Sequence, residues 1–433
     1  MNIMKSTIAT LVALFSCSSA IAQEGAWHGD LNVYGTKLPL VFHFSTNGCT
    51  MDSPSQGAKG IATEWKRQDD GKVVIDIPTI NGKYEGQYDG KEIKGTFSQN
   101  GISMALTLTP GEKQIKRPQT PVPPFHYQTE EVTFDNGNTT LHGTLTLPEN
   151  MNSKTPVVLM VTGSGQQNRD EELFFHKPFA VIADALAKQG IASLRYDDRG
   201  YGHPDVSFMS FTTDIFKQDA ACGIMYLRKR FKKVGVLGHS EGGTIALLLA
   251  AEGKADFVVS LAGMAVSGEE TLLDQNRVSL SSLQIPEEVV NNYCNRLSQA
   301  LDDIKAGRRI EDIETGNIPG GLKKVFETAM QQCESPYMRH FISIDVRPQL
   351  VNIKCPVLAL NGTKDSQVNC ENNLKALGNG LKNCRHKIMA MDGLNHLFQH
   401  CTPATALNYG AIEETISGDV LEDIVKFVGS IAK

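Results

Sequence analysis

The residues best suited to chemistry lie in a Gly-x-Ser-x-Gly pentapeptide, Gly-His-Ser-Glu-Gly at 238–242. The pentapeptide follows the apolar run 234–237 and precedes a stretch of small and apolar residues at 244–249. A strand, a sharp turn and a helix in this order are typical of a nucleophile elbow, which exposes a serine hydroxyl at the top of a sheet. The turn leaves no room for side chains two positions before and after the serine, which explains the two glycines. Ser240 is therefore the predicted nucleophile of a serine hydrolase.

A serine nucleophile needs a base that takes its proton and a carboxylate that orients the base. In folds that carry a nucleophile elbow, the acid and the histidine follow the serine along the chain, in loops after late strands. Asp365 follows the apolar run 357–360, and His396 follows the last predicted strand. Asp392 and His400 are the alternatives. Asp392 is too close in sequence to His396 to orient it from across the sheet, and His400 lies a further turn along.

Two backbone N–H groups are needed to stabilise the negatively charged oxygen of the tetrahedral intermediate. One is expected from Glu241, at a helix N-terminus whose dipole favours negative charge. The other is expected from the loop Thr-Gly-Ser-Gly-Gln at 162–166, where the Ser164 amide is the first choice and the Gly165 amide the next. This loop lacks the Gly-Lys-Ser/Thr ending of a phosphate-binding P-loop. His239, beside the nucleophile, is expected to point away from it and to pack.

Two polar clusters, Asn-Arg-Asp-Glu at 168–171 and Tyr-Asp-Asp-Arg-Gly at 196–200, follow strands on the same edge. Such groups can bind a substrate carboxylate. Paired Arg and Asp in adjacent loops more often form structural ion pairs, however. We interpret both clusters as structural.

The sequence pattern predicts that the strands and helices around these residues form two domains. A hairpin pattern at 131–147, followed by alternating buried strands and amphipathic helices, predicts a mostly parallel sheet with helices on both faces within 128–433. The stretch from about 267 to 351 is helical in pattern and has no place in the sheet, so we expect an inserted helical cap above the active-site edge. Residues 23–115 carry Asp-Gly and Asn-Gly pairs at intervals of eight to eleven residues, which predicts a small antiparallel β-barrel or sandwich. A proline-rich linker is expected at 116–127.

The first 22 residues have the layout of an export signal. Lys5 supplies the positive charge, 8–15 the apolar core, and Ala-Ile-Ala at 20–22 a cleavage site. The apolar core is too short to span a bilayer, and no later stretch reaches the required ~20 residues. The bulky side chain of Phe15, two positions before Cys17, disfavours a lipoprotein signal. We expect a periplasmic or secreted protein without a membrane span.

The cysteines permit disulfides in such a compartment. Nine are present, one of them Cys17 in the signal, and the other eight allow about a hundred pairings. A local bridge such as Cys370 to Cys384 is expected to stiffen the loops around the acid and the histidine, while Cys222 is expected to be a free thiol in a helix.

Composition sets limits on ligands and partners. No Cys/His cluster has zinc spacing, so we expect neither a metal nor a cofactor. The net charge is −6 and the 42 Lys and Arg residues are scattered. We therefore do not expect nucleic acid as a partner.

Taken together, these motifs resemble the α/β-hydrolases, and within them bacterial esterases in which a Gly-Ser-Gly loop leads to Arg-Asp. The matching motifs are Gly-Ser-Gly at 163–165, Arg-Asp at 169–170, Asp-Asp-Arg-Gly at 197–200, Gly-His-Ser-Glu-Gly at 238–242, Asn-Gly-x-x-Asp at 361–365 and Asn-His at 395–396. The resemblance covers about 127–433. It implies a cofactor-free hydrolase of carboxylic esters with short acyl chains, acting on a small-molecule or glycan-linked ester, with the cap shaping the pocket.

Two other functions are consistent with the sequence. Similar sequences are often described as serine aminopeptidase-like, and a peptidase of that kind needs acids in the cap to hold the substrate's amine. Glu269, Glu270 and Asp274 are candidates, although the helix dipole also explains acids at a helix start. Alternatively, the β-domain is a glycan- or lipid-binding module and the hydrolase fold is incidental. An ancillary β-domain that packs against the enzyme is the simpler interpretation.

Overall fold

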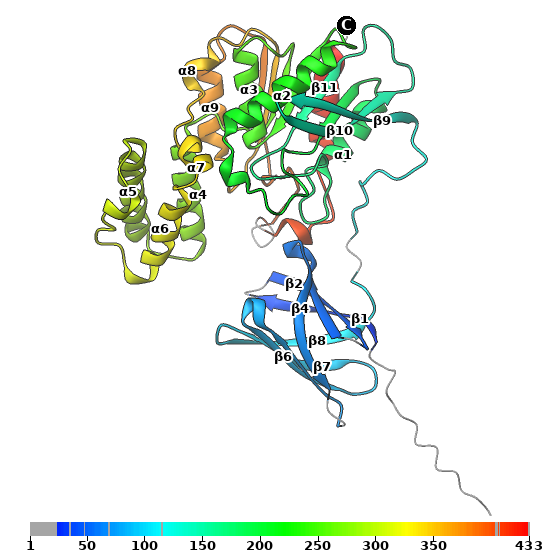
Figure 1. Ribbon diagram of the computed structural model, residues 1–433, viewed down its shortest axis with the longest axis vertical. Helices are drawn as coiled ribbons and strands as arrows, with labels where there is room; N and C mark the ends of the chain where they lie inside the picture. The colour runs from blue at the N-terminus through cyan, green and yellow to red at the C-terminus, as the bar shows by residue number, and fades with distance from the viewer. Residues whose placement is uncertain are drawn as a thin grey trace, which may run out of the picture. The chain divides into compact units, whose positions relative to one another are not determined.

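The computed structural model describes residues 24–33, 36–46, 48–67, 70–113, 116–402, 406 and 408–431. The predicted export signal, residues 1–22, lies outside the described residues. The chain divides after residue 115 into two compact units, drawn in Figure 1. Each unit has its own hydrophobic packing: the first has one core and the second has two.

The first unit is a closed barrel of eight antiparallel strands, each paired with the next along the chain. Every second residue of β3 and β5 is buried, so one face of each strand lines the interior. The barrel closes where β8 pairs with β1 at Trp27 and His28. Between β7 and β8, Asn100 and Gly101 both have positive φ (49° and 82°), as a two-residue hairpin turn requires. The strands are β1 (Gly25–Val33), β2 (Thr36–Ser45), β3 (Gly48–Ser53), β4 (Ala58–Arg67), β5 (Lys72–Ile77), β6 (Gly82–Tyr88), β7 (Ile93–Gln99) and β8 (Ile102–Pro110).

The second unit is built on an eight-stranded mixed sheet in the order β16-β15-β14-β13-β11-β12-β10-β9. The six strands from β16 to β12 are parallel, and β10 pairs antiparallel with both β12 and β9. Strands β11, β13, β14 and β15 are buried at every residue, as parallel strands covered on both faces must be. The strands are β9 (Tyr127–Asn136), β10 (Thr139–Pro148), β11 (Val157–Val161), β12 (Ala192–Tyr196), β13 (Val234–His239), β14 (Val258–Leu261), β15 (Val357–Gly362) and β16 (His386–Met391).

Helices cover both faces of this sheet (Figure 1). Apolar residues of α1 (Pro178–Ala187) and α10 (Gly418–Ile431) form one core with one face of the strands. Those of α2 (Thr213–Arg228), α3 (Glu241–Ala251) and α9 (Cys370–Gly380) form the core on the other face. The predicted fold class is therefore confirmed.

The predicted helical insertion leaves the sheet after β14 and returns at β15. A capping box between Ser267 and Glu270 begins its first helix. Figure 1 shows α5 and α6 standing away from the sheet, beyond α4 and α7. Its helices are α4 (Gly268–Ser282), α5 (Glu287–Lys305), α6 (Gly320–Gln332), α7 (Pro336–Phe341) and α8 (Arg347–Leu350).

The predicted Cys370–Cys384 disulfide is wrong, because both cysteines are free thiols. Cys370 is the first residue of α9, and Cys384 follows the end of that 11-residue helix. Such a helix is about 16 Å long, and a disulfide needs Cα atoms within about 7 Å of each other. Burial raises the pKa of the Cys370 thiol to about 11.

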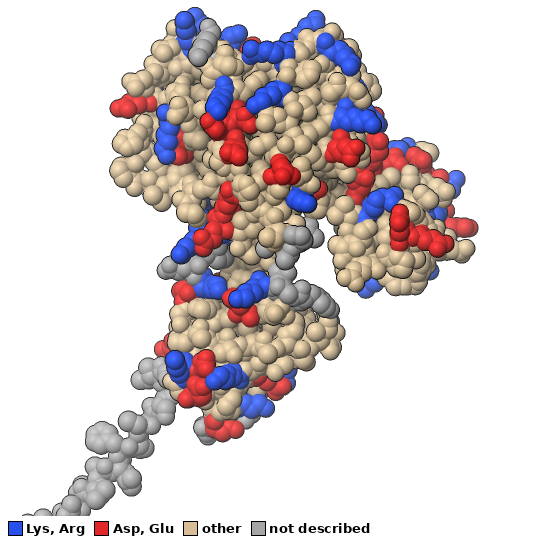
Figure 2. Space-filling view, turned by 180° about the vertical axis from the view of Figure 1, so that it is seen from behind, with Lys and Arg blue, Asp and Glu red and all other residues tan. Residues whose placement is uncertain are grey.

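Charged side chains of both signs are interspersed on the face of the molecule seen in Figure 2. Among the residues the structure describes, no helix has the length and apolar character needed to cross a membrane.

Candidate active site

Ser240 lies in the sharp turn between β13 and α3. Its backbone has φ 52° and ψ −120°, a conformation that a non-glycine residue adopts only when its surroundings enforce it. The Ser240 amide donates to the Leu261 carbonyl of the neighbouring strand at 2.8 Å. A Cβ at Gly238 would overlap the Gly242 carbonyl, and a Cβ at Gly242 would overlap the Val161 carbonyl. The turn therefore has the strain and the glycine requirement of a nucleophile elbow.

Asp365 and His396 meet across the loops after β15 and β16. The His396 Nδ1 donates to Asp365 Oδ2 at 2.8 Å, which leaves Nε2 as the ring's basic nitrogen. The other carboxylate oxygen accepts from the amides of Gln367 and Val368. Asn361 donates to the same oxygen as His396, at 3.0 Å. The carboxylate is thus fixed in position and orients the imidazole.

The two rivals make other contacts. Asp392 accepts a hydrogen bond from Thr363 Oγ1 at 3.1 Å. His400 is exposed and contacts Glu414 at 2.9 Å. Neither residue lines the cavity that contains Ser240 and His396.

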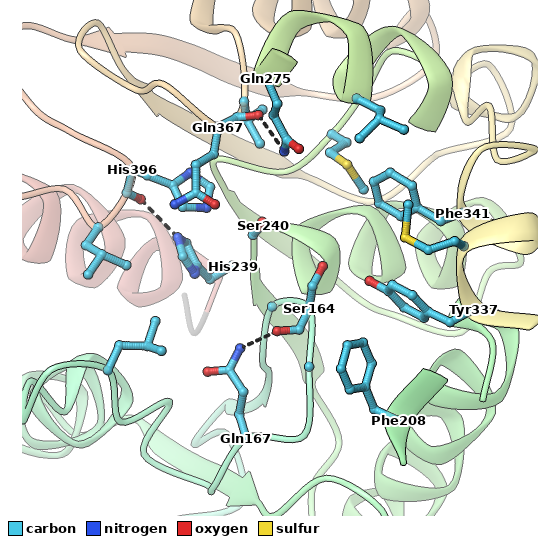
Figure 3. Close-up of a pocket in the computed structure, with 18 of the residues that line it drawn as sticks. Ser164, Gln167, Phe208, His239, Ser240, Gln275, Tyr337, Phe341, Gln367 and His396 are labelled. Atoms are coloured by element: carbon cyan, nitrogen blue, oxygen red, sulfur yellow. Dashed lines mark hydrogen bonds between the residues drawn. The ribbon is translucent and has the colours of Figure 1, made fainter. Parts of the chain in front are cut away.

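That cavity has a volume of about 470 Å³. Ser164 and Gly165 line it together with Ser240 and His396. Figure 3 shows Phe208, Tyr337 and Phe341 across the cavity from His396. Aromatic and aliphatic side chains form most of the wall, and the lining residues that the structure describes include no Asp, Glu, Lys or Arg.

The loop after β11 lines the same cavity as Ser240, with Gly163, Ser164 and Gly165 in its wall. The Gly163 amide donates to Glu171 Oε1 at 2.8 Å, so it is committed elsewhere. This leaves the amides of Ser164 and Gly165 as the candidate donors from the loop. The Glu241 amide, at the first residue of α3, is the candidate donor on the other side.

The Glu241 carboxylate joins this loop to the cap. Its Oε2 accepts from Ser164 Oγ at 2.8 Å and from the Tyr337 hydroxyl of α7 at 2.5 Å. Burial and the neighbouring Glu241 carboxylate raise the pKa of Tyr337 well above its ordinary value, so this phenol is a donor. Glu241 Oε1 is buried without a hydrogen-bond partner in the described part of the chain. The sequence contained no signal for this contact, because the orientation of a cap helix depends on tertiary packing.

His239 does more than pack, which corrects the expectation from the sequence. Its Nδ1 contacts Glu171 Oε1 at 3.0 Å, and its Nε2 contacts the His396 carbonyl at 2.9 Å. The ionised Glu171 carboxylate and the His396 carbonyl are both acceptors, so this geometry favours the ring with both nitrogens protonated. Burial lowers the pKa of His239, but the charge and hydrogen bond of Glu171 outweigh it and the pKa is raised. Glu171 and His239 thus form a buried ion pair that supports the His396 backbone.

The Arg-Asp clusters are structural, as interpreted from the sequence. Arg169 binds both oxygens of Asp197, and Arg195 pairs with Asp170. Asp198 accepts from Thr162 at 2.8 Å and from the Gln167 amide at 2.9 Å. These contacts fix the loop that carries the candidate oxyanion donors. Among the described residues, no charged side chain of these two clusters lines the cavity.

The acids proposed for an aminopeptidase also lie elsewhere. Glu269 pairs with Lys305, Glu270 completes the capping box of α4, and Asp274 accepts from an asparagine of α9. Within the described residues no group of three or more His, Cys, Asp or Glu is arranged to hold a metal ion.

Comparisons with known proteins agree with this architecture. Residues 177–314 match the family described as serine aminopeptidase, S33. The second unit has the fold class of the α/β-hydrolases, and the chain is similar in sequence to members of that family. The chain is 29% identical over 315 residues to the esterase EstD of Thermotoga maritima, and the match covers 70% of this chain and 69% of that protein.

Two further matches have lower sequence identity. The human serine hydrolase BPHL (Homo sapiens) is 26% identical over 194 residues, covering 42% of this chain and 56% of that protein. Among solved structures, Est1E from Butyrivibrio proteoclasticus aligns with a TM-score of 0.40 and 18% identity, over 70% of this chain and 98% of that one.

Proposed function

We propose that this chain is an exported carboxylic-ester hydrolase that acts through an acyl-enzyme on Ser240. The proposal depends on one arrangement of three residues. Ser240 lies in a strained turn and lines the same cavity as His396. The Nδ1 atom of His396 donates a hydrogen bond of 2.8 Å to Asp365. A hydroxyl, a base and an orienting carboxylate are the parts that nucleophilic acyl transfer requires. Similarity to an esterase supports the same reaction class.

In the proposed reaction, the oxygen of Ser240 attacks the ester carbonyl while His396 Nε2 takes its proton. The amides of Glu241 and Ser164, or of Gly165 in place of Ser164, stabilise the developing oxyanion. His396 then returns the proton to the leaving alcohol. Water, activated by the same histidine, releases the acid and restores the serine.

The substrate class follows from the wall of the cavity. A volume of about 470 Å³ with mostly apolar lining suits a short acyl chain and a small alcohol. The absence of acidic side chains among the described lining residues leaves no counter-charge for the ammonium of a peptide substrate. Ester hydrolysis is therefore favoured over removal of N-terminal residues.

Labelling with a fluorophosphonate, followed by intact-mass measurement, tests the nucleophile. The expected result is one adduct on the unmodified chain and none on Ser240→Ala. Turnover of p-nitrophenyl esters should fall as the acyl chain lengthens beyond a few carbons. An adduct that persists in Ser240→Ala would refute the assignment, as would faster cleavage of aminoacyl anilides than of esters.

Matched histidine variants test the base. His396→Ala should lower kcat at least about a thousandfold, because a triad acts as a unit. His400→Ala alters an exposed side chain four residues away and should leave turnover within about twofold. Equal effects of the two substitutions would contradict the proposed role of His396.

Export is a separate part of the proposal and rests on the residues at 1–22. Expression of the full chain in a Gram-negative host should give a mature protein whose first residue is Gln23. An N-terminus at residue 1 on protein held in the cytoplasm would refute it.

A further inference from the structure

The barrel unit contains a cavity of about 580 Å³ at one end. Its lining comes from the ends of the strands that meet at four connections, β1 to β2, β3 to β4, β5 to β6 and β7 to β8. The size falls within the range of small-molecule sites, about 300–1,000 Å³. The catalytic cavity of the hydrolase unit shares no residue with it.

The opposite end of the barrel is filled by side chains. Along β2, the inward positions Leu38 and Leu40 line the cavity, whereas Phe42 and Phe44 continue into a packed aromatic layer. Phe42 packs on Tyr84 with ring centroids 5.9 Å apart, and Phe44 packs on Trp65 at 5.2 Å. The cavity is therefore a blind tube, roughly 13 Å deep from Leu38 to Phe42 at the rise of a β-strand.

The residues that line the cavity are apolar at its inner end and more polar near its mouth. Leu40, Met51 and Phe97 are buried and form the inner wall. Gln56, Gln99 and other amide or hydroxyl side chains stand nearer the strand ends. None of the described residues that line the cavity is Asp, Glu, Lys, Arg or His.

We propose that this cavity binds a neutral amphiphile, with an alkyl chain in the tube and an uncharged, hydrogen-bonding head at the mouth. The apolar inner wall favours an alkyl chain, and the closed inner end leaves the head at the mouth. A carboxylate or ammonium head would lose its hydration at the mouth without meeting an opposite charge. Amide and hydroxyl groups can instead exchange hydrogen bonds with a glycerol hydroxyl or an ester carbonyl. The proposal stands independently of the proposed ester hydrolysis.

Tryptophan fluorescence of the full chain gives a local readout, because the chain's two tryptophans, Trp27 and Trp65, both belong to the barrel core. The probe is the ether lipid decylglycerol, used below its micelle concentration; an ether bond is not a substrate for an esterase. The expected result is a saturable change in emission. Decanoate and decyltrimethylammonium, which have the same chain but charged heads, should bind at least about tenfold more weakly.

Two substitutions of the same kind localise the site. Ala58→Phe places a ring in the lining and should weaken decylglycerol binding about tenfold or more. Ala105→Phe places the same ring on an exposed position of β8 and should leave binding unchanged. Met104→Glu, which adds a carboxylate to the lining, should shift preference toward decyltrimethylammonium, and it serves if Ala58→Phe does not fold.

Three results would overturn the proposal. The first is the absence of saturable binding of decylglycerol to the unmodified chain. The second is equal binding by folded Ala58→Phe and Ala105→Phe, because the ligand would then lie elsewhere. The third is binding of decanoate as tight as that of decylglycerol, because the head would then not need to be neutral.

Discussion

Replacing Glu171 by glutamine tests whether the buried ion pair behind the nucleophile supports the site. Glu171 is 1% exposed, and its Oε1 accepts from both His239 Nδ1 and the Gly163 amide, at 3.0 and 2.8 Å. Glutamine has nearly the same shape and keeps an oxygen in that place. The substitution therefore removes the charge and retains the geometry.

The expected loss can be worked from those two hydrogen bonds. A hydrogen bond to a charged group contributes about 1.5–3 kcal/mol, and one between neutral groups about 0.5–1.5 kcal/mol. The difference is about 1 kcal/mol for each bond, so Glu171→Gln should destabilise the hydrolase unit by about 2 kcal/mol. Removal of a partner without such a replacement would cost about 3–5 kcal/mol.

The loss should depend on pH because His239 is the charged partner. Burial acts to lower the pKa of His239, but the Glu171 carboxylate outweighs it, and the folded-state pKa is raised. The stabilisation is therefore fully present below the unfolded-state pKa of about 6.5 and disappears as the pH rises through the higher folded-state pKa. Glu171→Gln should be most destabilising near about pH 6 and progressively less so at alkaline pH.

Two spectroscopic signals can separate the units during urea unfolding. Far-ultraviolet circular dichroism follows the hydrolase unit, which contains every α-helix that the structure describes. Tryptophan fluorescence follows the barrel, where both tryptophans lie, and it should not change. Glu172→Gln is the matched control, since Glu172 is partly exposed and pairs with Lys177; its effect should stay within about 0.5 kcal/mol. A destabilisation by Glu171→Gln that is the same at acid and alkaline pH would refute the ion pair.

Three further substitutions test the rest of the site. Asp365→Asn should lower kcat by about a thousandfold or more, because His396 loses its orienting carboxylate, whereas Asp392→Asn should change kcat little; progress curves with a p-nitrophenyl ester measure both. Tyr337→Phe should lower kcat about tenfold with a smaller change in KM. The double variant Tyr337→Phe/Glu241→Gln should have a kcat only slightly below that of Glu241→Gln alone, because both substitutions break the same chain of hydrogen bonds. Additive losses of kcat would contradict this coupling. Gly238→Ala should prevent the elbow from forming, because the new methyl group would overlap a backbone carbonyl, and a folded, fully active variant would show that the turn can relax.

The parts of the molecule that the sequence predicted are those governed by local rules. The elbow was visible because glycines two residues on either side of Ser240 are required by the backbone itself. Asp365 and His396 were predicted from chain order, since each follows a strand of the parallel sheet, and the structure brings their side chains into contact. The antiparallel barrel is one of the two forms, barrel or sandwich, that the recurring Asp-Gly and Asn-Gly pairs predicted. Of these pairs only Asn100-Gly101 forms the expected two-residue turn, between Gln99 and Ile102; the pairs near residues 70, 81 and 89 lie in four-residue connections.

The contacts that the sequence did not predict join distant segments. Glu171 and His239 are 68 residues apart, and Glu241 and Tyr337 are 96 apart. Their pairing depends on how a loop and a cap helix pack, and no periodic pattern encodes that packing. The two adjacent acids at 171 and 172 differ in burial for the same reason, and only Glu171 contacts His239. The incorrect disulfide prediction likewise ignored the length of the intervening helix.

The three carboxylates around the nucleophile differ in how well their charge is compensated. Asp365 accepts from two amides, an asparagine and His396, and Glu171 faces a protonated His239. Glu241 has only the hydroxyls of Ser164 and Tyr337, and its second oxygen is buried without a partner in the described residues. An incompletely satisfied buried carboxylate is costly, and such exceptions to the rules of folding concentrate at functional sites. The Glu241 carboxylate links the cap helix α7 to the loop that carries the candidate oxyanion donors. The position of the cap and the geometry of the candidate oxyanion hole therefore depend on each other.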